Sequence, residues 1–503
     1  MLYSLLACTD PSGERAAPGD SSAELDTAFD GGDSGMPPTF DETVDVLVIG
    51  AGPAGLAAAA EVVAAGATVL VLERETWAGG ACNDAAVMFF AGTPEQAALG
   101  IEDSPERLAA DWNAFTGGDA DDPWFAYFAE NHVAMVKDWL AERGLQWGTP
   151  TADSGSGDVE RIFEIDGWGP ELVAVLLDQI PNDAVRYEAS ASTLLVDGGH
   201  VVGASWTDLA SGSSHSIGAD AVIVATGGFQ YDLERVKALI PDVATSALRR
   251  GSFINADGNG HDMLSSVGAV TQNLDALGFY AHATFHPDSD TGELTSQVFG
   301  EYPLVAGDGL RFADDSDAQS FVLGRTRALL PGESAWLVSS GQIRGMPFAN
   351  PDDVSEVWSV DQLVEAGVII EANDVTELAS TMGIDGAALS SEVDAWNAAV
   401  RGEVDDPWRD EAGMAEVGPP PFYAMPVAAT AAKAFGGIDV DLSGRVIDDD
   451  GVPIPGAYAA GELTGMLGGS IVGEHGFTGS LTAVVLGGRV AGMAAAGEST
   501  GGE

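Results

Sequence analysis

The sequence predicts an α/β fold, in which helices cover a parallel β-sheet, and two observations support this prediction. A continuous β-branched run at 44–49 is followed at once by a glycine-rich turn and by an alanine-rich stretch at 56–65, the order of strand, turn and helix. A second apolar run at 221–225 also ends in a glycine pair, as a buried parallel strand does. With 503 residues, 46% of them apolar, the chain can bury a large core in two to four domains.

The turn at 50–55, Gly-Ala-Gly-Pro-Ala-Gly, matches the dinucleotide-binding fingerprint in its full strand–turn–helix context. Gly50 permits the tight turn, Gly52 lets the backbone approach a pyrophosphate, and Gly55 lets helix and strand pack closely. The N-terminus of the following helix offers N–H donors and a positive dipole end to phosphates. We therefore expect a dinucleotide to be bound by Gly50, Gly52, Pro53, Ala54 and Gly55.

The second strand, expected at 68–72, ends at Glu73, which lies 23 residues after Gly50. A carboxylate at this place is positioned to accept hydrogen bonds from the adenosine ribose hydroxyls. Arg74 and the loop Gly79-Gly80-Ala81 follow, and this order resembles flavoproteins in which an acid and a basic residue precede a Gly-Gly loop that reaches the isoalloxazine. The pattern therefore favours FAD over NAD.

Three later segments complete the pattern: the glycine turn after 221–225, a strand at 456–460 that ends on an acid, and a helix that starts at 480 and ends near 497. Their functional residues are Thr226, Gly227, Gly228, Gly461, Glu462, Ser480 and Leu481. Together these segments resemble the fumarate reductase / succinate dehydrogenase flavoprotein family, which includes flavocytochrome c and the 3-ketosteroid dehydrogenases. The resemblance covers about 44–278 and 420–499.

The resemblance implies one FAD per chain, bound in an extended form. It implies that Glu462 contacts the ribityl chain and that the backbone N–H groups of Ser480 and Leu481 face the N1–C2=O edge of the flavin. A helix N-terminus there stabilises the negative charge of reduced flavin. The Gly-Gly loop at 79–84 contains no histidine, so we expect non-covalent FAD, with Cys82 as a small residue packed beneath the flavin.

By the family pattern, the domains are a Rossmann-like FAD-binding domain at 44–278 and 434–503 and an inserted α+β capping (substrate) domain at 279–433. Inside the first part, 101–144 is expected to form helices, one of them capped by Asp122 with Pro123 in its first turn.

The fumarate-reducing members of the family bind two carboxylates in a positively charged pocket, because arginine forks replace the water that a dicarboxylate loses. His282-Ala283-Thr284 matches one segment of that pocket, and Lys433 stands where a further histidine is expected. The stretch at 313–320, where the proton-donating arginine belongs, has no arginine, and its Asp314, Asp315 and Asp317 are expected to add repulsion. Fumarate and succinate are therefore poor substrate candidates.

The stretch from His475 to Gly479 resembles the place where 3-ketosteroid dehydrogenases polarise a substrate carbonyl with a tyrosine and a glycine. We expect His475 to be the donor side chain and Gly479 to supply a backbone N–H. The candidates for proton transfer are His475, Lys433, His282, Tyr302 and Tyr423.

The sequence thus predicts an FAD-dependent oxidoreductase that moves a hydride between flavin N5 and a carbon next to a carbonyl, in a neutral, apolar, steroid-like substrate. Two alternatives stay open at this point. The first is a reductase of an activated alkene acid, as in fumarate reductase, and the second is an FAD-binding electron carrier without turnover.

The net charge is −58, from 20 basic and 78 acidic residues spread along the chain. Such a field repels nucleic acid and anionic lipid headgroups, so we expect neither as a partner. The acidic residues form a solvated surface that suits either high salt or simple solubility.

Cysteine and apolar content limit the cofactors and the location. Cys8 and Cys82 alone cannot ligate a four-cysteine zinc site or an iron–sulfur cluster, and we expect no metal. Electrons must therefore enter or leave through a separate donor or acceptor, which is a quinone, a cytochrome or O₂. Residues 1–43 are expected to be a disordered leader. Its start resembles a lipoprotein signal with Cys8 as the lipidated residue, so the protein is either an exported cell-envelope lipoprotein or cytoplasmic, and we expect no transmembrane helix.

Overall fold

The computed structural model describes residues 39–500 apart from short segments, which are 154–155, 246–247, 252–255, 297, 318–319, 333–334, 352, 354, 410–413, 469–471 and 474. The expected lipid anchor at Cys8 lies outside the described residues and stays a prediction. The first strand begins at Glu42, two residues earlier than the sequence suggested.

A mostly parallel sheet forms the centre of the described chain, and it confirms the predicted α/β fold. Its strand order is β23-β24-β9-β1-β2-β6, in which only β23 is antiparallel to its neighbour. The antiparallel strands β7 and β8 extend it beside β9. The strands are β1 (Glu42–Ile49), β2 (Val69–Leu72), β6 (Val185–Arg186), β7 (Ala189–Asp197), β8 (His200–Asp208), β9 (Ser214–Val224), β23 (Arg445–Ile447) and β24 (Pro453–Ala459).

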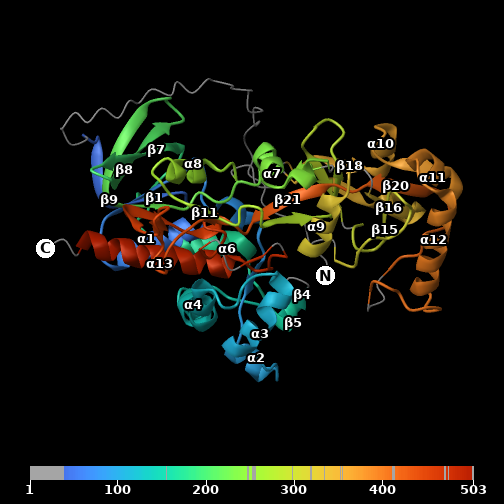
Figure 1. Ribbon diagram of the computed structural model, residues 1–503, viewed down its shortest axis with the longest axis horizontal. Coiled ribbons are helices and arrows are strands. Elements are labelled where there is room, and N and C mark those ends of the chain that lie inside the picture. The colour runs from blue at the N-terminus through green and yellow to red at the C-terminus, as the bar shows by residue number, and fades with distance from the viewer. Residues whose placement is uncertain are drawn as a thin grey trace. The chain divides into compact units, whose positions relative to one another are not determined.

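Two helices, α1 (Pro53–Ala64) and α13 (Leu481–Thr500), pack against each other and against this sheet (Figure 1). Glycines permit the close crossing of the two helices. A Cβ on Gly488 would lie 2.2 Å from the Ala54 carbonyl oxygen, and one on Gly492 would lie 2.4 Å from that of Ala58. The alanine-rich sequence of α1 therefore reflects helix-to-helix contact as well as helix propensity.

The segment between β2 and β6 packs against the helices α1 and α13. Its elements are η1 (Gly80–Asp84), β3 (Val87–Phe89), α2 (Pro94–Ala98), α3 (Pro105–Thr116), α4 (Pro123–His132), η2 (Val133–Asp138), α5 (Trp139–Ala141), β4 (Thr151–Asp153), β5 (Gly157–Glu164) and α6 (Trp168–Leu177). Asp122 caps α4 as predicted, since its carboxylate accepts from the Trp124 N–H at 2.8 Å. The sequence did not indicate that this helix continues through a π-helical turn, η2.

A second cluster of buried apolar side chains is formed by residues from Ala281 to Val427 in the sequence. It is built on two antiparallel sheets. The sheets have the orders β13-β14-β17-β18 and β15-β16-β20-β19. The elements are β13 (Ala283–Phe285), β14 (Glu293–Thr295), β15 (Leu304–Ala306), α9 (Phe321–Leu329), β16 (Ala335–Ser340), η4 (Gly341–Gly345), β17 (Pro347–Ala349), β18 (Val357–Ser359), α10 (Val360–Glu365), β19 (Ile370–Ala372), α11 (Val375–Met382), α12 (Gly386–Val400) and β20 (Phe422–Pro426). The expected domain bounds at 279 and 433 stay a prediction.

A small sheet of order β10-β21-β12 connects the two cores, because β21 (Ala429–Ala434) follows β20 directly and leads back toward β24. This strand carries Lys433. The other elements of this region are α7 (Leu233–Leu239), η3 (Pro241–Thr245), β10 (Leu248–Arg250), α8 (Asn259–Ser265), β11 (Thr271–Gln272), β12 (Leu277–Tyr280), β22 (Gly437–Ile438) and η5 (Gly461–Leu463).

Candidate active site

The dinucleotide turn lies at the carboxyl end of β1. In the sheet, β1 has β2 on one side and β9 on the other, so the chain leaves β1 at the point where the strand order reverses. Gly50 has a φ of +104°, and a Cβ there would lie 2.5 Å from the Ala225 carbonyl oxygen. A Cβ on Gly55 would lie 1.9 Å from the carbonyl oxygen of Gly50. In contrast, a Cβ on Gly52 would meet no atom within 4 Å. Open space therefore remains at the N-terminus of α1, where a phosphate group binds best.

Glu73, at the end of β2, is buried beside this turn. Its Oε2 accepts from the Ala51 N–H at 2.8 Å and its Oε1 accepts from the Glu75 N–H at 2.8 Å. Burial raises the pKa of Glu73, while these two backbone donors lower it. Each carboxylate oxygen carries a second lone pair, so Glu73 can still accept from ribose hydroxyls. The guanidinium of its neighbour Arg74 forms an ion pair with Asp257 at 2.6 Å, so its charge is already shared with a carboxylate of the chain.

The Gly-Gly loop is tied directly to the dinucleotide turn, since the Gly79 N–H donates to the Ala51 carbonyl at 2.8 Å. Gly79 and Gly80 both have positive φ, and a Cβ on Gly80 would meet no atom within 4 Å. Ala81, the third predicted residue of this loop, is exposed, whereas Cys82 is buried. Burial raises the pKa of the Cys82 thiol to about 12, so the thiol stays protonated and is a poor nucleophile or metal ligand.

Glu462 follows β24 and lies on the other side of the turn from Glu73. Its Oε1 accepts from the Gln230 Nε2 at 3.0 Å and from the Ala434 N–H at 3.0 Å. Burial raises the pKa of Glu462, while backbone hydrogen bonds and the charge of Lys433 lower it. The preceding residue, Gly461, is close to α1, because a Cβ there would lie 2.8 Å from the Ala54 Cβ.

The glycine turn after β9 faces the same region. Gly227 has a φ of +84°, and a Cβ there would meet no atom within 4 Å. A Cβ on Gly228 would lie 3.0 Å from the Glu462 Cδ. The Thr226 hydroxyl lies on the side of α8, since a Cβ on Gly260 would lie 2.0 Å from it. The structure therefore brings the turns after β1, β9 and β24 together.

The start of α13 is fixed by β3. Ser480 forms a β-bridge with Met88, and the Phe89 N–H donates to the Thr482 hydroxyl at 3.0 Å. Lys433 reaches the same place from β21, since its Nζ donates to the Ser480 Oγ at 3.2 Å. Ser480, Leu481, Glu462 and Lys433 therefore form one group at the N-terminus of α13.

Aromatic side chains lie beside this group. The Lys433 Nζ is 5.4 Å from the ring centroid of Phe321, and Phe321 contacts Phe435 edge to face at 5.3 Å. Phe321 also stacks on Tyr280 at 5.0 Å. A Cβ on Gly476 would lie 2.2 Å from the Phe435 ring, so the segment that carries His475 runs against these rings. We call Tyr280, Phe321 and Phe435 the aromatic cluster.

His282 and His475 lie at the margins of the aromatic cluster. The His282 ring is 4.9 Å from that of Tyr280, and its Nε2 is 4.0 Å from the Glu293 carboxylate. Burial lowers the pKa of His282 to about 4, so the ring is neutral near pH 7. His475 is half-buried, and its ring lies against Gly117, where a Cβ would be 3.4 Å from the His475 Nδ1.

The two tyrosine candidates belong to the second core. Tyr302 is buried, and its hydroxyl is 3.4 Å from the Gln342 side-chain oxygen. Tyr423 lies on β20 with Glu371 opposite it on β19, and burial together with Glu371 raises its pKa to about 12. The contacts of neither tyrosine lead to Lys433 or the aromatic cluster, so both stay predictions without a structural link to this site.

The structure corrects the expected repulsion by Asp315. This carboxylate is buried, and it accepts from Arg311 at 2.7 Å and from Arg409 at 2.8 Å. Arg311 also pairs with Asp406 at 2.7 Å. The charge of Asp315 is therefore neutralised, and the two arginines are engaged by carboxylates of the chain itself. Residues 318–319 of the same stretch lie outside the described residues.

Sequence reasoning missed Gln230 and the aromatic cluster. Gln230 is buried, and its Nε2 bridges Glu462 and the Ala432 carbonyl. Gln230 follows the predicted glycine turn by two residues, which was the available signal. The three aromatic residues lie in separate segments of the chain, and no local pattern unites them.

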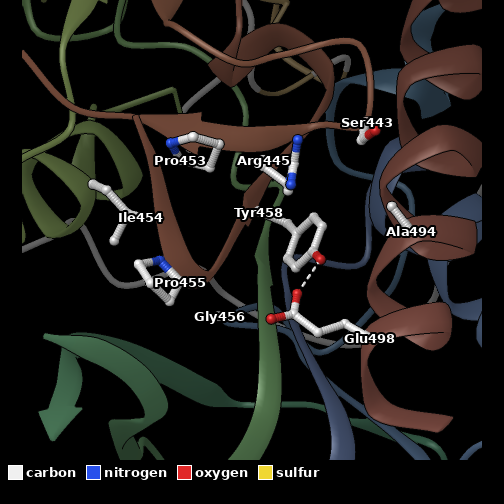
Figure 2. A pocket seen from close by; sticks show the side chains of 9 residues that line it. All are labelled: Ser443, Arg445, Pro453, Ile454, Pro455, Gly456, Tyr458, Ala494 and Glu498. Carbon is white, nitrogen blue, oxygen red and sulfur yellow. Dashed lines mark hydrogen bonds between the residues drawn. The ribbon is translucent and has the colours of Figure 1, made fainter. Parts of the chain in front are cut away.

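Figure 2 shows a different cavity, of about 510 Å³, between β23, β24 and the end of α13. The Tyr458 hydroxyl donates to Glu498 there, and Arg445 pairs with Asp441 at 2.7 Å. Glu498 is 17 residues beyond Leu481, so the cavity lies about 26 Å along α13 from its N-terminus. It also borders the first residues of β24, which lie at the opposite end of the strands from the dinucleotide turn. This cavity is therefore not the cofactor site.

The described residues fit an extended FAD. The open space at Gly52, Gly80 and Gly227 would hold the cofactor, and Glu73 can accept from the ribose of the adenosine half. Gln230 offers a further acceptor, because its buried Oε1 has no hydrogen-bond partner. These features define an FAD-dependent oxidoreductase as the class of protein.

Comparison with known proteins agrees with this class. A family model described as FAD binding domain matches residues 45–474, and the chain therefore belongs to that family. A urocanate reductase of Eggerthella lenta is 27% identical over 90% of this chain and 74% of its own length. A fumarate reductase (cytochrome) of Shewanella frigidimarina is 28% identical over 90% and 77%. A KsdD-like steroid dehydrogenase of Mycobacterium tuberculosis is 27% identical over 90% and 96%.

Solved structures show the same fold. A flavocytochrome c3 fumarate reductase in its open conformation superimposes with a TM-score of 0.68 and 26% identity, over 91% of this chain and 79% of that one. A 3-ketosteroid-Δ4-(5α)-dehydrogenase from Rhodococcus jostii superimposes with a TM-score of 0.69 and 24% identity, over 92% and 99%. The predicted family resemblance, the fold and FAD as cofactor are thereby confirmed.

Within the described part of the chain, no group of three or more histidine, cysteine, aspartate or glutamate residues is arranged to hold a metal ion. No helix among the described residues is long and apolar enough to cross a membrane.

Proposed function

We propose that the enzyme oxidises or reduces a C–C bond next to the carbonyl group of a neutral, largely apolar substrate. The observation that carries this proposal is the aromatic cluster beside the N-terminus of α13. Tyr280, the partly exposed ring of the cluster, offers an apolar substrate a contact surface, and the buried rings of Phe321 and Phe435 behind it bring no charge for a dicarboxylate. Bound FAD supplies the two-electron acceptor or donor by hydride transfer at flavin N5.

The charged groups of the chain support a neutral substrate. A dicarboxylate needs a cation for each end, because an unpaired charge costs several kcal/mol when it leaves water. Arg311 and Arg409 are engaged by Asp315 and Asp406, and His282 is neutral near pH 7. Lys433 is one positive charge and lies close to Glu462.

His475 is the proposed donor to the substrate carbonyl. It immediately precedes Gly476, which packs against the aromatic cluster, and it lies six residues before Leu481, the first residue of α13. A neutral or protonated imidazole that donates to the carbonyl oxygen makes the adjacent C–H more acidic. Removal of one such donor typically lowers turnover by about 100-fold or more.

The substrate class is tested by anaerobic spectroscopy of the holoenzyme. Oxidised enzyme is mixed with saturated ketones and photoreduced enzyme is mixed with their unsaturated counterparts, with succinate and fumarate in parallel. We expect the visible flavin absorbance to change with a cyclic ketone or enone and to stay constant with the dicarboxylates. Rapid reoxidation of the reduced enzyme by fumarate would contradict the proposal.

Two variants test His475. His475→Ala should lower turnover by about 100-fold and leave the flavin spectrum nearly unchanged. His475→Phe keeps a ring against Gly117 without a donor, so it should be as slow as the alanine variant if donation matters. Full activity of His475→Phe would limit the residue to packing and would move the search to Lys433 and His282.

A second candidate is a reductase of an alkene acid with one carboxylate. Two observations favour it: the single cation Lys433 beside aromatic rings, and relatives named urocanate reductase and fumarate reductase. Reoxidation of the photoreduced enzyme by urocanate, without a response to neutral enones, would establish this candidate in place of the first.

The electron partner is proposed to be a separate quinone, cytochrome or O₂. One relative is named fumarate reductase (cytochrome), which supports a separate carrier for this chain as well. The single dinucleotide fingerprint is taken by FAD, so the isolated enzyme should not oxidise NADH. NADH oxidation at about 1–1000 per second would contradict this assignment.

A further inference from the structure

The position of the flavin half of FAD follows from the order of the strands. Glu73 follows β2 and Glu462 follows β24, with β1 and β9 between them. A dinucleotide held at Glu73 and at the N-terminus of α1 would have its other half on the side of β9 and β24. Glu462, Lys433 and the start of α13 meet on that side and would hold the flavin half.

Two charges of opposite sign lie at this place. The Lys433 ammonium donates to Ser480, the residue directly before α13, at 3.2 Å. The carboxylate of Glu462 is close enough for the charge of Lys433 to act on it. The 20-residue helix α13 adds the positive end of its dipole. Replacing Lys433 by a neutral residue would remove a positive charge from the region around Ser480 and leave the carboxylate of Glu462 there.

Reduction of the cofactor changes this balance, because reduced flavin carries negative charge on its pyrimidine ring. A nearby carboxylate disfavours that charge, whereas a helix N-terminus and an ammonium group favour it. The contacts of Lys433 suit such a role. Its Nζ is held between the Ser480 hydroxyl and the face of Phe321, and both contacts fix the ammonium at the end of the helix.

We propose that Lys433, together with the N-terminus of α13, stabilises the negative charge of reduced FAD and thereby raises the reduction potential of the bound cofactor. The lysine offsets Glu462, whose carboxylate the site retains for contacts to the cofactor and to Gln230. Lys433 is then a charge-stabilising residue rather than the proton donor of the reaction. This inference depends on bound FAD and not on the identity of the substrate.

The test measures the midpoint potential of the holoenzyme against reference dyes. Lys433→Met should lower the potential so that the equilibrium constant for two-electron reduction falls at least tenfold, which is about 30 mV. Lys433→Arg keeps the charge and should stay within threefold of the parent. Lys237→Met is the matched control, because it removes the same charge from α7, where Lys237 pairs with Glu234.

A second measurement uses sulfite, which binds oxidised flavins more tightly when positive charge lies near the ring. The dissociation constant for sulfite should rise at least tenfold in Lys433→Met and change less than twofold in Lys237→Met. If Lys433→Met does not retain FAD, Lys433→Gln preserves a donor to Ser480 without the charge and is measured in its place. The proposal is overturned if the uncharged variant keeps the parent's potential and sulfite affinity, or if Lys237→Met shifts both equally.

Failure of this inference and failure of the substrate proposal are distinguishable. An unchanged potential with strongly reduced turnover in Lys433→Met would assign Lys433 to the substrate and overturn its role toward the cofactor. A lowered potential in an enzyme that reduces urocanate would retain the role of Lys433 and replace only the substrate class.

Discussion

Glu73 shows how one side chain shapes a binding turn and keeps capacity for a ligand. Its two oxygens each hold one backbone N–H of the chain, at Ala51 and Glu75, and each retains a lone pair. Burial disfavours the charge of this carboxylate, and the two backbone N–H donors and the nearby charge of Arg74 offset part of that cost. Bound ribose would add donors, so ligand and turn stabilise the same carboxylate.

We therefore predict that Glu73→Ala weakens FAD binding by about 1–3 kcal/mol, the cost of leaving hydrogen-bonding groups unpaired. The measurement is the dissociation constant of FAD from the quenching of its fluorescence. Glu75→Ala is the control, because it keeps the backbone N–H that Glu73 accepts from. Equal FAD affinity in Glu73→Ala and the parent would show that the carboxylate does not contact the cofactor.

His261 is a buried imidazole whose two nitrogens have no hydrogen-bond partner. It lies on α8 with its ring perpendicular to Phe229 at 5.1 Å, and burial together with the charge of Arg235 lowers its pKa to about 3. The folded protein therefore binds this proton less readily than the unfolded chain does. Stability is complete above the ordinary histidine pKa, near 6.5, and falls by about 1.4 kcal/mol per unit as the pH drops below it.

His261→Leu should stabilise the protein by about 1–3 kcal/mol at pH 7, because it removes two unpaired polar atoms from the core. It should also flatten the loss of stability between about pH 6 and pH 4. Urea unfolding at several pH values measures both effects. His132 has a similarly lowered pKa, of about 4, so the variant should reduce the acid sensitivity and not abolish it. Parallel pH curves for variant and parent would contradict this account.

At the scale of elements, the crossing of α1 and α13 depends on glycines of α13 that face α1. Gly488 lies against the backbone of Ala54, whereas a Cβ on the neighbouring Gly487 would come no closer than 3.7 Å to another atom. The two helices carry the pyrophosphate turn and the charged group at Ser480. Their separation would therefore move both ends of the cofactor site.

Gly488→Ala should lower the free energy of unfolding by about 1–3 kcal/mol, the usual cost of overpacking, and should weaken FAD binding as well. Gly487→Ala is the matched control. It adds the same methyl group to the same helix without a close contact, and it gains about 1 kcal/mol of helix propensity. Thermal unfolding of the apo- and holoproteins compares the two variants. Equal stability of both would mean that the helices adjust without cost.

The elements that sequence predicted and those that it missed differ in a physical way. The turn at 50–55 and Glu73 form one local unit, in which strand, turn and helix follow each other and each glycine has its own steric reason. Gln230 and Glu462 are 232 residues apart and meet only through the sheet order. The aromatic cluster is assembled from three separate segments in the same way. Local chemistry was therefore predictable, whereas the contacts that fold topology creates were not.

Asp315 illustrates the same limit for charges. In the sequence it appeared to be one of three acids that repel an anionic substrate. In the folded chain Arg409, 94 residues away, neutralises it together with Arg311. The effect of a charge on a site depends on its partners, and long-range partners are not visible in a sequence.

At the scale of the whole molecule, the net charge of −58 acts on stability. Like charges repel more in the compact state than in the expanded chain, and salt screens them within about 10 Å at 0.1 M and about 3 Å at 1 M. We predict that NaCl raises the unfolding temperature steadily between 0.01 and 1 M. Sucrose at equal osmolality is the control, because it acts without screening. A melting temperature that is independent of NaCl would assign the acidic surface to solubility alone.

The same charge should select among electron carriers, because the field of the protein attracts cations and repels anions before contact. We predict that the photoreduced enzyme is reoxidised faster by the cation hexaammineruthenium(III) at low salt, and that this rate falls at least tenfold between 0.01 and 1 M NaCl. The rate with the anion ferricyanide should rise over the same range, and that with a neutral quinone should change little. Stopped-flow measurement of the flavin absorbance gives all three rates. Opposite salt responses of cation and anion would favour a basic cytochrome or a neutral quinone as the physiological partner, whereas identical responses would show that the field does not reach the site of electron exchange.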